Sequence, residues 1–319
     1  DDWMLHWADF PSVLIDEQRV MAHYSQKSQA GKYSFDVKTV FSHDKGNNFS
    51  KAYTLNLEGV KGENGMVSLL PLEGGRSFAT WLDSRTTAKE GGTGGMSLRG
   101  ATFNSTGDII KQWELDNRTC DCCSTDTAMT KQGPVVVYRD RSDTDIRDIS
   151  IVRQVNGEWT APVTIHNDGW QIKGCPMNGP AIDAKDNYVA VSWLTIKNDV
   201  PSINLKLSKN GGKTFGDLIE VVNGDINGRV DIEIIESGAV VVSWFASNPE
   251  NTKLMLAKYS FSGKFIDKLV VAESKSLRRS GLPSITSHEN QIYMSWTDID
   301  TNKVKVAKIT WDSAPSDIL

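Results

Sequence analysis

The sequence has few cysteines and histidines, no long apolar run and no cluster of like charges, and each shortage excludes a class of protein. Its 319 residues contain 35 lysines and arginines against 40 aspartates and glutamates, which gives a net charge of −5. Because proteins that follow the phosphates of nucleic acid rely on clustered positive charge, nucleic-acid binding is not expected. No apolar run approaches the roughly 20 residues that cross a bilayer, so no transmembrane segment is expected.

Hydrophobic residues make up 39% of the chain and charged residues 24%, which supplies enough apolar material for a large core. The four cysteines are an even number, as is usual in an oxidising compartment. The chain begins Asp1-Asp2-Trp3 without an apolar leader, as it would after cleavage of a secretory signal or after trimming. We therefore expect an exported protein, periplasmic or extracellular.

An apolar run that closes on an aromatic residue recurs along the chain. The closing aromatics are 57, 57, 55, 51 and 52 residues apart, so six units account for the whole length. The closing residues are Tyr24, Trp81, Tyr138, Trp193, Trp244 and Trp296. A second short segment lies about a dozen residues before each aromatic, and turn residues such as Glu73-Gly-Gly75 separate the two, which predicts a hairpin.

Further apolar segments follow the aromatic, for example 35–41 and 203–207, and we find no segment with helical periodicity. Four strands in each repeat of this length predict an all-β, six-bladed β-propeller of four-stranded antiparallel blades, with residues 1–319 in a single domain. The last repeat lacks a fourth strand, whereas the stretch Trp3–Trp7 has no other unit to join. We predict that this N-terminal strand completes the last blade and closes the ring.

Two turns between third and fourth strands share a pattern of serine, a short polar residue, glycine and an aromatic. The polar side chain can bind the amides of its own turn, the glycine supplies a positive φ, and the aromatic is expected to pack back between sheets. The pattern resembles the Asp-box (BNR repeat) of sialidase-like β-propellers, in which it is structural. Its residues are Ser42, Asp44, Gly46 and Phe49 in the first repeat, and Ser208, Asn210, Gly212 and Phe215 in the fourth.

Other segments resemble exported bacterial sialidase-like proteins. They are Cys120-Asp-Cys-Cys123, Tyr138-Arg-Asp-Arg-Ser142, Ile146-Arg-Asp-Ile149 and Gly174-Cys-Pro-Met-Asn-Gly-Pro180. The resemblance implies the propeller fold. It transfers no catalytic residue, because the Phe/Tyr-Arg-Ile-Pro motif of true sialidases is absent and no Tyr–Glu pair matches a motif.

The antiparallel order of strands decides which residues share an end of the propeller. Connections between blades lie at the same end as connections from second to third strands, and long loops gather there. Asp83, Asp140 and Asp298 each come two residues after their unit's aromatic, so they are expected at equivalent positions around this mouth. The same end receives His6, Asp9, Asp145, Arg279 and all four cysteines.

Arginines at this mouth would attract an anion, because their planar groups match carboxylate or phosphate. We expect the face to bind an acidic glycan or small anion, and hydrolysis of that ligand stays open. Asp83 and Asp140 are the candidate acid and base. The candidate ligand-binding residues are Arg85, Arg139, Arg141, Arg147, Arg229, Asp231 and Arg278. The alternative is that these charges pair with one another at the strand ends.

The cysteines lie in the loops that enter the third and fourth blades, which are neighbours. One disulfide between Cys175 and one of Cys120, Cys122 and Cys123 is expected, with a second bond among the remaining pair as an option. A thiolate site for copper or zinc is the alternative, with His166 and Met177 as the nearest further ligands, and a reactive redox thiol is a third. The rival function is thus a non-catalytic scaffold or metal-handling protein. Otherwise no cofactor is expected, and we expect a monomer.

Overall fold

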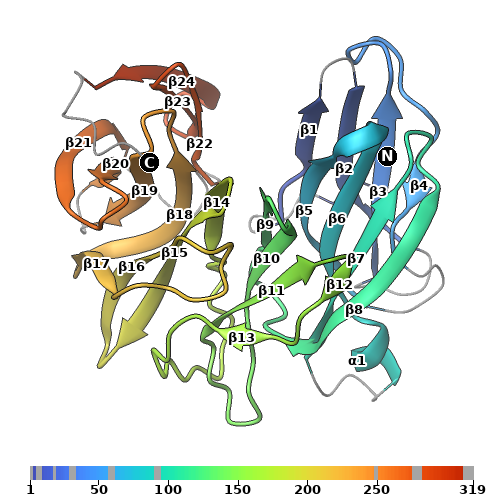
Figure 1. Ribbon diagram of the computed structural model, residues 1–319, viewed down its shortest axis with the longest axis horizontal. Coiled ribbons are helices and arrows are strands. Elements are labelled where there is room, and N and C mark those ends of the chain that lie inside the picture. Colours follow the sequence, from blue (N-terminus) through green and yellow to red (C-terminus); the bar gives the residue numbers. More distant parts are fainter. Residues whose placement is uncertain are drawn as a thin grey trace.

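The computed structural model of the chain describes residues 3–4, 9–16, 19–28, 34–56, 62–89, 95–247, 251–274 and 282–311. These residues form the six antiparallel sheets of a six-bladed β-propeller, and the sheets follow one another around an axis in chain order (Figure 1). The predicted fold class is confirmed.

Strand order within each blade follows the chain. The first blade contains β1 (Ser12–Asp16), β2 (Arg19–Lys27), β3 (Phe35–Ser42) and β4 (Tyr53–Thr54). The second contains β5 (Asn64–Leu72), β6 (Arg76–Asp83), β7 (Met96–Phe103) and β8 (Ile109–Thr119). The third contains β9 (Asp126–Thr130), β10 (Gly133–Arg139) and β11 (Ile149–Val155), with the short β12 (Glu158–Trp159) and β13 (Val163–Thr164) both paired to β11.

The remaining blades follow the same plan. The fourth contains β14 (Ala181–Lys185), β15 (Tyr188–Lys197), β16 (Val200–Ser208) and β17 (Ile219–Asn223). The fifth contains β18 (Ile226–Ile234), β19 (Val240–Ser247), β20 (Thr252–Tyr259) and β21 (Phe265–Ser274). The described part of the sixth contains β22 (Ser284–His288), β23 (Gln291–Asp298) and β24 (Lys303–Thr310).

The recurring aromatics all lie on the second strand of their blades, as the repeat predicts. Trp81, Trp193, Trp244 and Tyr138 are fully buried, whereas the aromatics of the first and last blades are half-buried. Buried apolar clusters join each blade to the next from the first to the sixth. Burial of apolar side chains between neighbouring blades is therefore what holds the ring together.

Among the described residues helix is nearly absent, as expected. The two short exceptions are a single 3-10 turn, η1 (Glu73–Gly75), and α1 (Arg85–Lys89), which lies between β6 and β7. No helix in the described part of the chain is long and apolar enough to span a membrane.

The prediction for the N-terminal strand is wrong for the residues that can be placed. Trp3 forms a bridge with Gln26 of β2 and stacks on Tyr24, and the Met4 amide donates to the Ser25 carbonyl at 2.9 Å. The segment therefore extends the first blade, because a neighbouring aromatic and free backbone groups lie within its reach. Residues 5–8 lie outside the described residues.

The facing sides of the first and last blades keep apolar side chains exposed. Val13 and Ile15 of β1 are 61% and 72% exposed, and Val304 and Val306 of β24 are 72% and 69% exposed. Among the described residues no buried apolar cluster joins these two blades.

The two Asp-box-like turns have one hydrogen-bond pattern. In the first, the Gly46 amide donates to Ser42 Oγ at 2.8 Å and the Asn48 amide donates to Asp44 Oδ1 at 2.8 Å. In the second, the Gly212 amide donates to Ser208 Oγ at 3.0 Å, and Asn210 Oδ1 accepts from the Thr214 amide at 2.9 Å.

Both glycines of these turns have positive φ, 88° at Gly46 and 77° at Gly212, as expected. Phe215 packs against the core between the third and fourth blades, whereas Phe49 is 49% exposed. The expectation that the aromatic packs between sheets is therefore right for the second turn and wrong for the first.

Candidate ligand site on the propeller axis

The predicted arginine-rich mouth consists largely of internal pairs. Arg85 donates to both carboxylate oxygens of Asp83 at 2.7 Å, and the Trp81 indole donates to the same group at 3.0 Å. Burial alone would raise the pKa of Asp83, but the hydrogen bonds from Arg85 hold it below its usual range. Asp83 is thus ionised and paired at neutral pH, which is unsuitable for a general acid.

Arg139 is a structural residue at the junction of the third and fourth blades. Its guanidinium is 1% exposed and donates to the carbonyl oxygens of Asn178, Arg147 and Leu194 at 2.8, 2.7 and 2.7 Å. It also lies 4.8 Å from the centre of the Trp170 ring. All of its hydrogen-bonding directions lead into the protein.

The other candidate arginines have similar surroundings. Arg141 pairs with Asp121 at 2.8 Å and with Asp145 at 3.0 Å, and Arg147, 3% exposed, pairs with Asp145 at 3.3 Å. Arg229 is 5% exposed. Arg278, Arg279 and His6 lie outside the described residues.

Asp140, the second candidate catalytic residue, lies beside other acids. It accepts from Ser150 Oγ at 3.0 Å and from the Arg141 amide at 2.6 Å. Burial and the negative charge of Asp116 raise its pKa. Asp83 and Asp140 thus have separate partners, and the described contacts do not bring them together.

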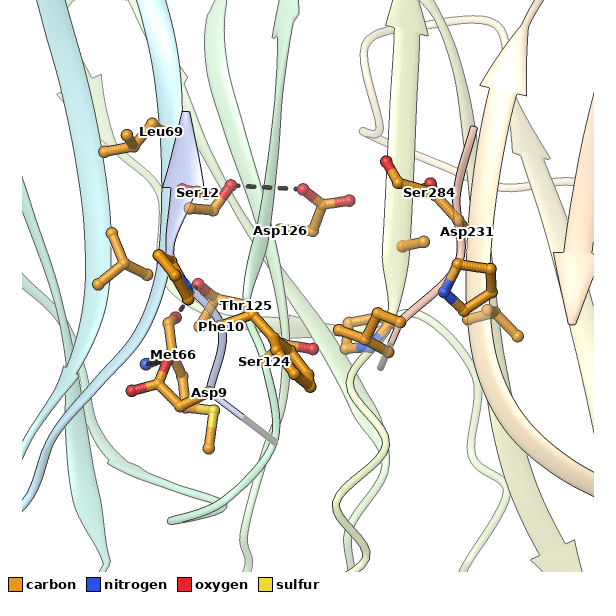
Figure 2. A pocket seen from close by; sticks show the side chains of 18 of the residues that line it. Asp9, Phe10, Ser12, Met66, Leu69, Ser124, Thr125, Asp126, Asp231 and Ser284 are labelled. Carbon is orange, nitrogen blue, oxygen red and sulfur yellow. Dashed lines mark hydrogen bonds between the residues drawn. The ribbon is translucent and has the colours of Figure 1, made fainter. Parts of the chain in front are cut away.

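A cavity of about 470 Å³ lies instead on the axis, at the same end as the predicted mouth. Apart from Thr297 of β23, its wall comes from the first strand of every blade or the loop just before that strand. Figure 2 shows Asp9, Phe10 and Ser12 on one side, Asp231 and Ser284 on the other, and Asp126 between them. The wall also carries the hydroxyls of Ser68, Ser124, Thr125 and Thr297, and it contains no arginine, lysine or histidine among the described residues.

The acids of this wall also bind the blades to one another. Asp126 accepts the Ile182 amide of the next blade at 2.9 Å, and Asp231 accepts the Ile285 amide of the next blade at 2.8 Å. Asp9 accepts the Met66 amide at 2.9 Å. We call these contacts, in which a carboxylate of one blade accepts a backbone amide of the next, carboxylate clasps.

A second tier of clasps lies further along the first strands. Asp183 accepts the Ile234 amide at 2.6 Å, and Glu233 accepts both the amide and the hydroxyl of Ser287, at 2.9 and 2.7 Å. Sequence reasoning missed Asp126, Asp183 and Glu233. Their signal was a carboxylate in the first strand at one of two registers, paired either with the residue before the blade's aromatic or with the residue three before it.

Burial gives the clasp acids unusual proton affinities. Burial is the largest cause in each case, and it raises the pKa of Asp126 to about 7, of Asp231 to about 8 and of Glu233 to about 7, although the amide hydrogen bonds act in the opposite direction. The cavity wall therefore holds carboxyl groups that are partly protonated near neutral pH and can donate as well as accept.

The cysteines form one disulfide and one thiol pair. Cys122 is bonded to Cys175, which confirms the expected bond between Cys175 and the cluster. Cys120 and Cys123 are free and buried, with their Sγ atoms 3.0 Å apart. The optional second disulfide is thus not formed, and the predicted metal ligand His166 instead contacts Asp168, with Nδ1 and Oδ1 2.8 Å apart.

The two free thiols have different proton affinities. The hydrogen bond from Cys123, with the charges of Arg139 and Arg147, lowers the pKa of Cys120 to about 6 despite its burial. Burial and the neighbouring Cys120 raise the pKa of Cys123. Cys120 is therefore the thiolate of the pair.

Comparison with known proteins supports the fold. No protein-family model matches the chain, and no curated protein matches it in sequence. An intramolecular trans-sialidase from Ruminococcus gnavus matches in structure with a TM-score of 0.57 and 11% identity, over 94% of this chain and 94% of that one.

Two further solved structures are similar. An α-L-arabinofuranosidase from Fusarium graminearum has a TM-score of 0.57 and 12% identity, over 95% of this chain and 92% of that one. A sialidase from Streptococcus pneumoniae has a TM-score of 0.54 and 10% identity, over 93% of this chain but only 66% of that one. At these identities the likeness shows a shared sialidase-like propeller fold.

Proposed function

We propose that this sialidase-like propeller binds a carbohydrate in its axial cavity. The observation that carries the proposal is the cavity itself, to which all six blades contribute residues and five of them contribute carboxylates or hydroxyls. Its volume of about 470 Å³ is within the range of roughly 300–1,000 Å³ that is typical of ligand pockets. The solved structures of similar fold include enzymes that act on carbohydrates, which agrees with this proposal.

The chemistry of the wall suits a ligand rich in hydroxyl groups. Ionised carboxylates accept hydrogen bonds from sugar hydroxyls, and the side chains of Ser12, Ser124 and Ser284 can donate or accept. The Phe10 ring and the neighbouring proline offer apolar surface for the face of a sugar ring.

The described residues favour a neutral sugar over an acidic one. Arg85, Arg139 and Arg141 have their guanidinium groups in internal contacts. The described cavity wall carries three acids, Asp9, Asp126 and Asp231, and no basic side chain, so it offers no positive charge to balance a carboxylated sugar. We therefore propose a neutral glycan as the ligand, in place of the acidic glycan or small anion that the arginines suggested.

Hydrolysis is the second candidate function, and the raised pKa values on the wall favour it. A carboxyl group whose pKa is about 7, as at Asp126, can protonate the leaving oxygen of a glycoside at neutral pH. Glycoside hydrolysis with Asp126 as the acid would give rates that fall as pH rises above about 7. Incubation with neutral oligosaccharides and chromatographic detection of products tests this.

Binding is tested by calorimetry with matched pairs of neutral oligosaccharides and their uronic-acid counterparts. Asp126→Asn should weaken binding of the neutral sugar by about 2 kcal/mol, or roughly 30-fold, because an amide nitrogen replaces one of the two carboxyl oxygens that bond the sugar. Asp183→Asn is the matched control, since Asp183 forms the same kind of clasp but does not line the cavity. Equal weakening by both variants, or tighter binding of the uronic acid, would contradict the proposal.

The disulfide supports an exported protein, because such bonds persist in oxidising compartments. Fractionation of cells that express the full gene, with thiol labelling of each fraction, tests this. We expect the disulfide-bonded protein outside the cytoplasm.

A further inference from the structure

A second cavity, of about 140 Å³, is lined by an unusual number of sulfur atoms. Four of the chain's eight methionines lie on its wall together with the disulfide. The sulfur-bearing residues are Met4, Met66, Met96, Met177, Cys122 and Cys175. They come from separate parts of the chain, so the fold gathers them.

The backbone at two of these methionines is held in an unfavourable conformation. Met66 has φ 56° and Met177 has φ 52°, in the left-handed region that long side chains seldom adopt. Strained positions of this kind concentrate at functional sites, where the surrounding structure maintains them. The two thioethers are thus held in place by the fold.

Two further sulfur atoms, those of Cys120 and Cys123, lie next to the Cys122 sulfur at this cavity. The Sγ atoms of Cys120, Cys122 and Cys123 are all within 4.8 Å of one another. Arg139 is buried beside the pair: its backbone carbonyl accepts the Cys120 amide at 3.0 Å, and its guanidinium donates to three uncharged carbonyl oxygens. Positive charge is therefore available to balance the negative charge of a group of thiolates.

We propose that these sulfurs form a binding site for monovalent copper, Cu(I), which opens when the Cys122–Cys175 disulfide is reduced. The thiolates of Cys120, Cys122 and Cys123 are the ligands, and the methionine thioethers of the cavity carry the ion to them. Soft thiolate and thioether donors select Cu(I). Zinc does not need the thioethers, so their number favours copper.

Two of the three carboxylates that line the cavity are already in use, and the third, Glu63, is exposed. Asp121 accepts the Met96 amide at 2.9 Å and pairs with Arg141, and Asp9 accepts the Met66 amide at 2.9 Å. Hard cations, which need several free oxygens, are accordingly disfavoured.

Reduction of the Cys122–Cys175 disulfide, which opens the site, consumes two molecules of a small thiol. The disulfide S–S bond breaks, the two small thiols become one disulfide, and their two protons and two electrons convert Cys122 and Cys175 to thiols. Cu(I) then binds without a change of oxidation state, and each ligating thiol releases its proton to water.

For the test, the full chain is reduced with a small thiol, and the thiol is then removed under anaerobic conditions. The reduced protein is titrated with Cu(I) in competition with a coloured Cu(I) chelator. The reduced protein should retain one Cu(I) with a sulfur-only shell in X-ray absorption, and the disulfide-bonded protein should yield it to the chelator. Failure of the reduced protein to compete, or displacement of the copper by an equal amount of zinc, would overturn the proposal.

Variants distinguish a loss of the copper site from a loss of folding. Cys123→Ser should weaken Cu(I) binding by at least about 100-fold, the upper end of the effect of residues that only support a ligand. Met96→Leu with Met177→Leu should slow Cu(I) uptake, whereas Met255→Leu with Met294→Leu, buried in other blades, should not. Equal uptake by the two methionine double variants would remove the role of the thioethers, and thermal melting verifies that each variant is folded.

Discussion

Arg139 illustrates how little the identity of a residue reveals about its role. The chain has many arginines near the ends of strands, and an arginine at a mouth is a natural candidate for anion binding. The partners of Arg139 come from positions 147, 178 and 194, which the fold brings together and no local pattern indicates. By contrast, the pair of Asp83 and Arg85, two residues apart, is readable once strand-end pairing is considered.

We expect Arg139→Leu to destabilise the protein by about 3–5 kcal/mol, since removal of the buried guanidinium leaves three buried carbonyl oxygens without their donor. Urea unfolding measures the loss. Arg76→Leu, at an exposed position, is the control and should change stability by less than about 0.5 kcal/mol. Similar losses in the two variants would show that Arg139 has no special structural role.

A glycine of the first Asp-box-like turn allows an equally local test. Gly46 has φ 88°, and a Cβ placed there would have no atom closer than 3.9 Å, so Gly46→Ala tests backbone conformation alone. The expected cost is about 1–2 kcal/mol. Gly216→Ala, at a glycine without positive φ, should be nearly neutral in the same melting experiment.

At the scale of elements, the first strands have two tasks, because they line the axis and also carry the carboxylate clasps. Short segments about a dozen residues before each aromatic predicted these strands, and the turn residues after them predicted the hairpins. Asp126, Asp183 and Glu233 within them went unnoticed because a carboxylate in a strand is usually expected to face solvent. Their partners, the amides of Ile182, Ile234 and Ile285, belong to other repeats and become visible only when the blades are assembled.

The clasps predict that stability falls as pH rises. The pKa values of Asp126, Asp231 and Glu233 in the folded protein, about 7, 8 and 7, are above those of the unfolded chain, so their protons are bound more tightly in the folded state. The stabilisation is complete below about pH 4 and is lost as pH rises through 7 to 8. Between pH 5 and 8 each group contributes up to about 1.4 kcal/mol per pH unit.

Urea unfolding at a series of pH values measures this slope. Asp231→Asn should reduce it, whereas Asp44→Asn should leave it unchanged, because the pKa of Asp44 is lowered to about 2 by hydrogen bonds, chiefly from Asn48. A stability that increases from pH 5 to 8 would contradict this account of the clasps.

At the scale of the whole molecule, the repeat in the sequence was sufficient to predict six blades, since each unit places an aromatic at the same position of its second strand. The ends were harder to predict. Trp3 lies on Tyr24 of its own blade, and this local contact competes with any long-range pairing to the last blade. The axial cavity was also beyond prediction, because each blade contributes only two to five residues to it.

The disulfide joins the loops that precede the third and fourth blades, which are 53 residues apart in sequence. Closing a loop of that length restricts the unfolded chain, so Cys122→Ala with Cys175→Ala should lower the free energy of unfolding by about 4 kcal/mol. Calorimetric melting under non-reducing conditions measures this. If the wild-type protein melts at the same temperature with and without reductant, the bond contributes little.

The clasps also have a direction. In four of the five junctions the carboxylate belongs to the earlier blade and the amide to the later one, from Asp9 to Met66 and finally from Asp231 to Ile285. During synthesis the first, third, fourth and fifth blades thus each carry an acceptor for a partner that the ribosome has yet to make. Until that partner is made, the acid remains hydrated and charged. Proton uptake by the acid therefore accompanies the packing of the next blade.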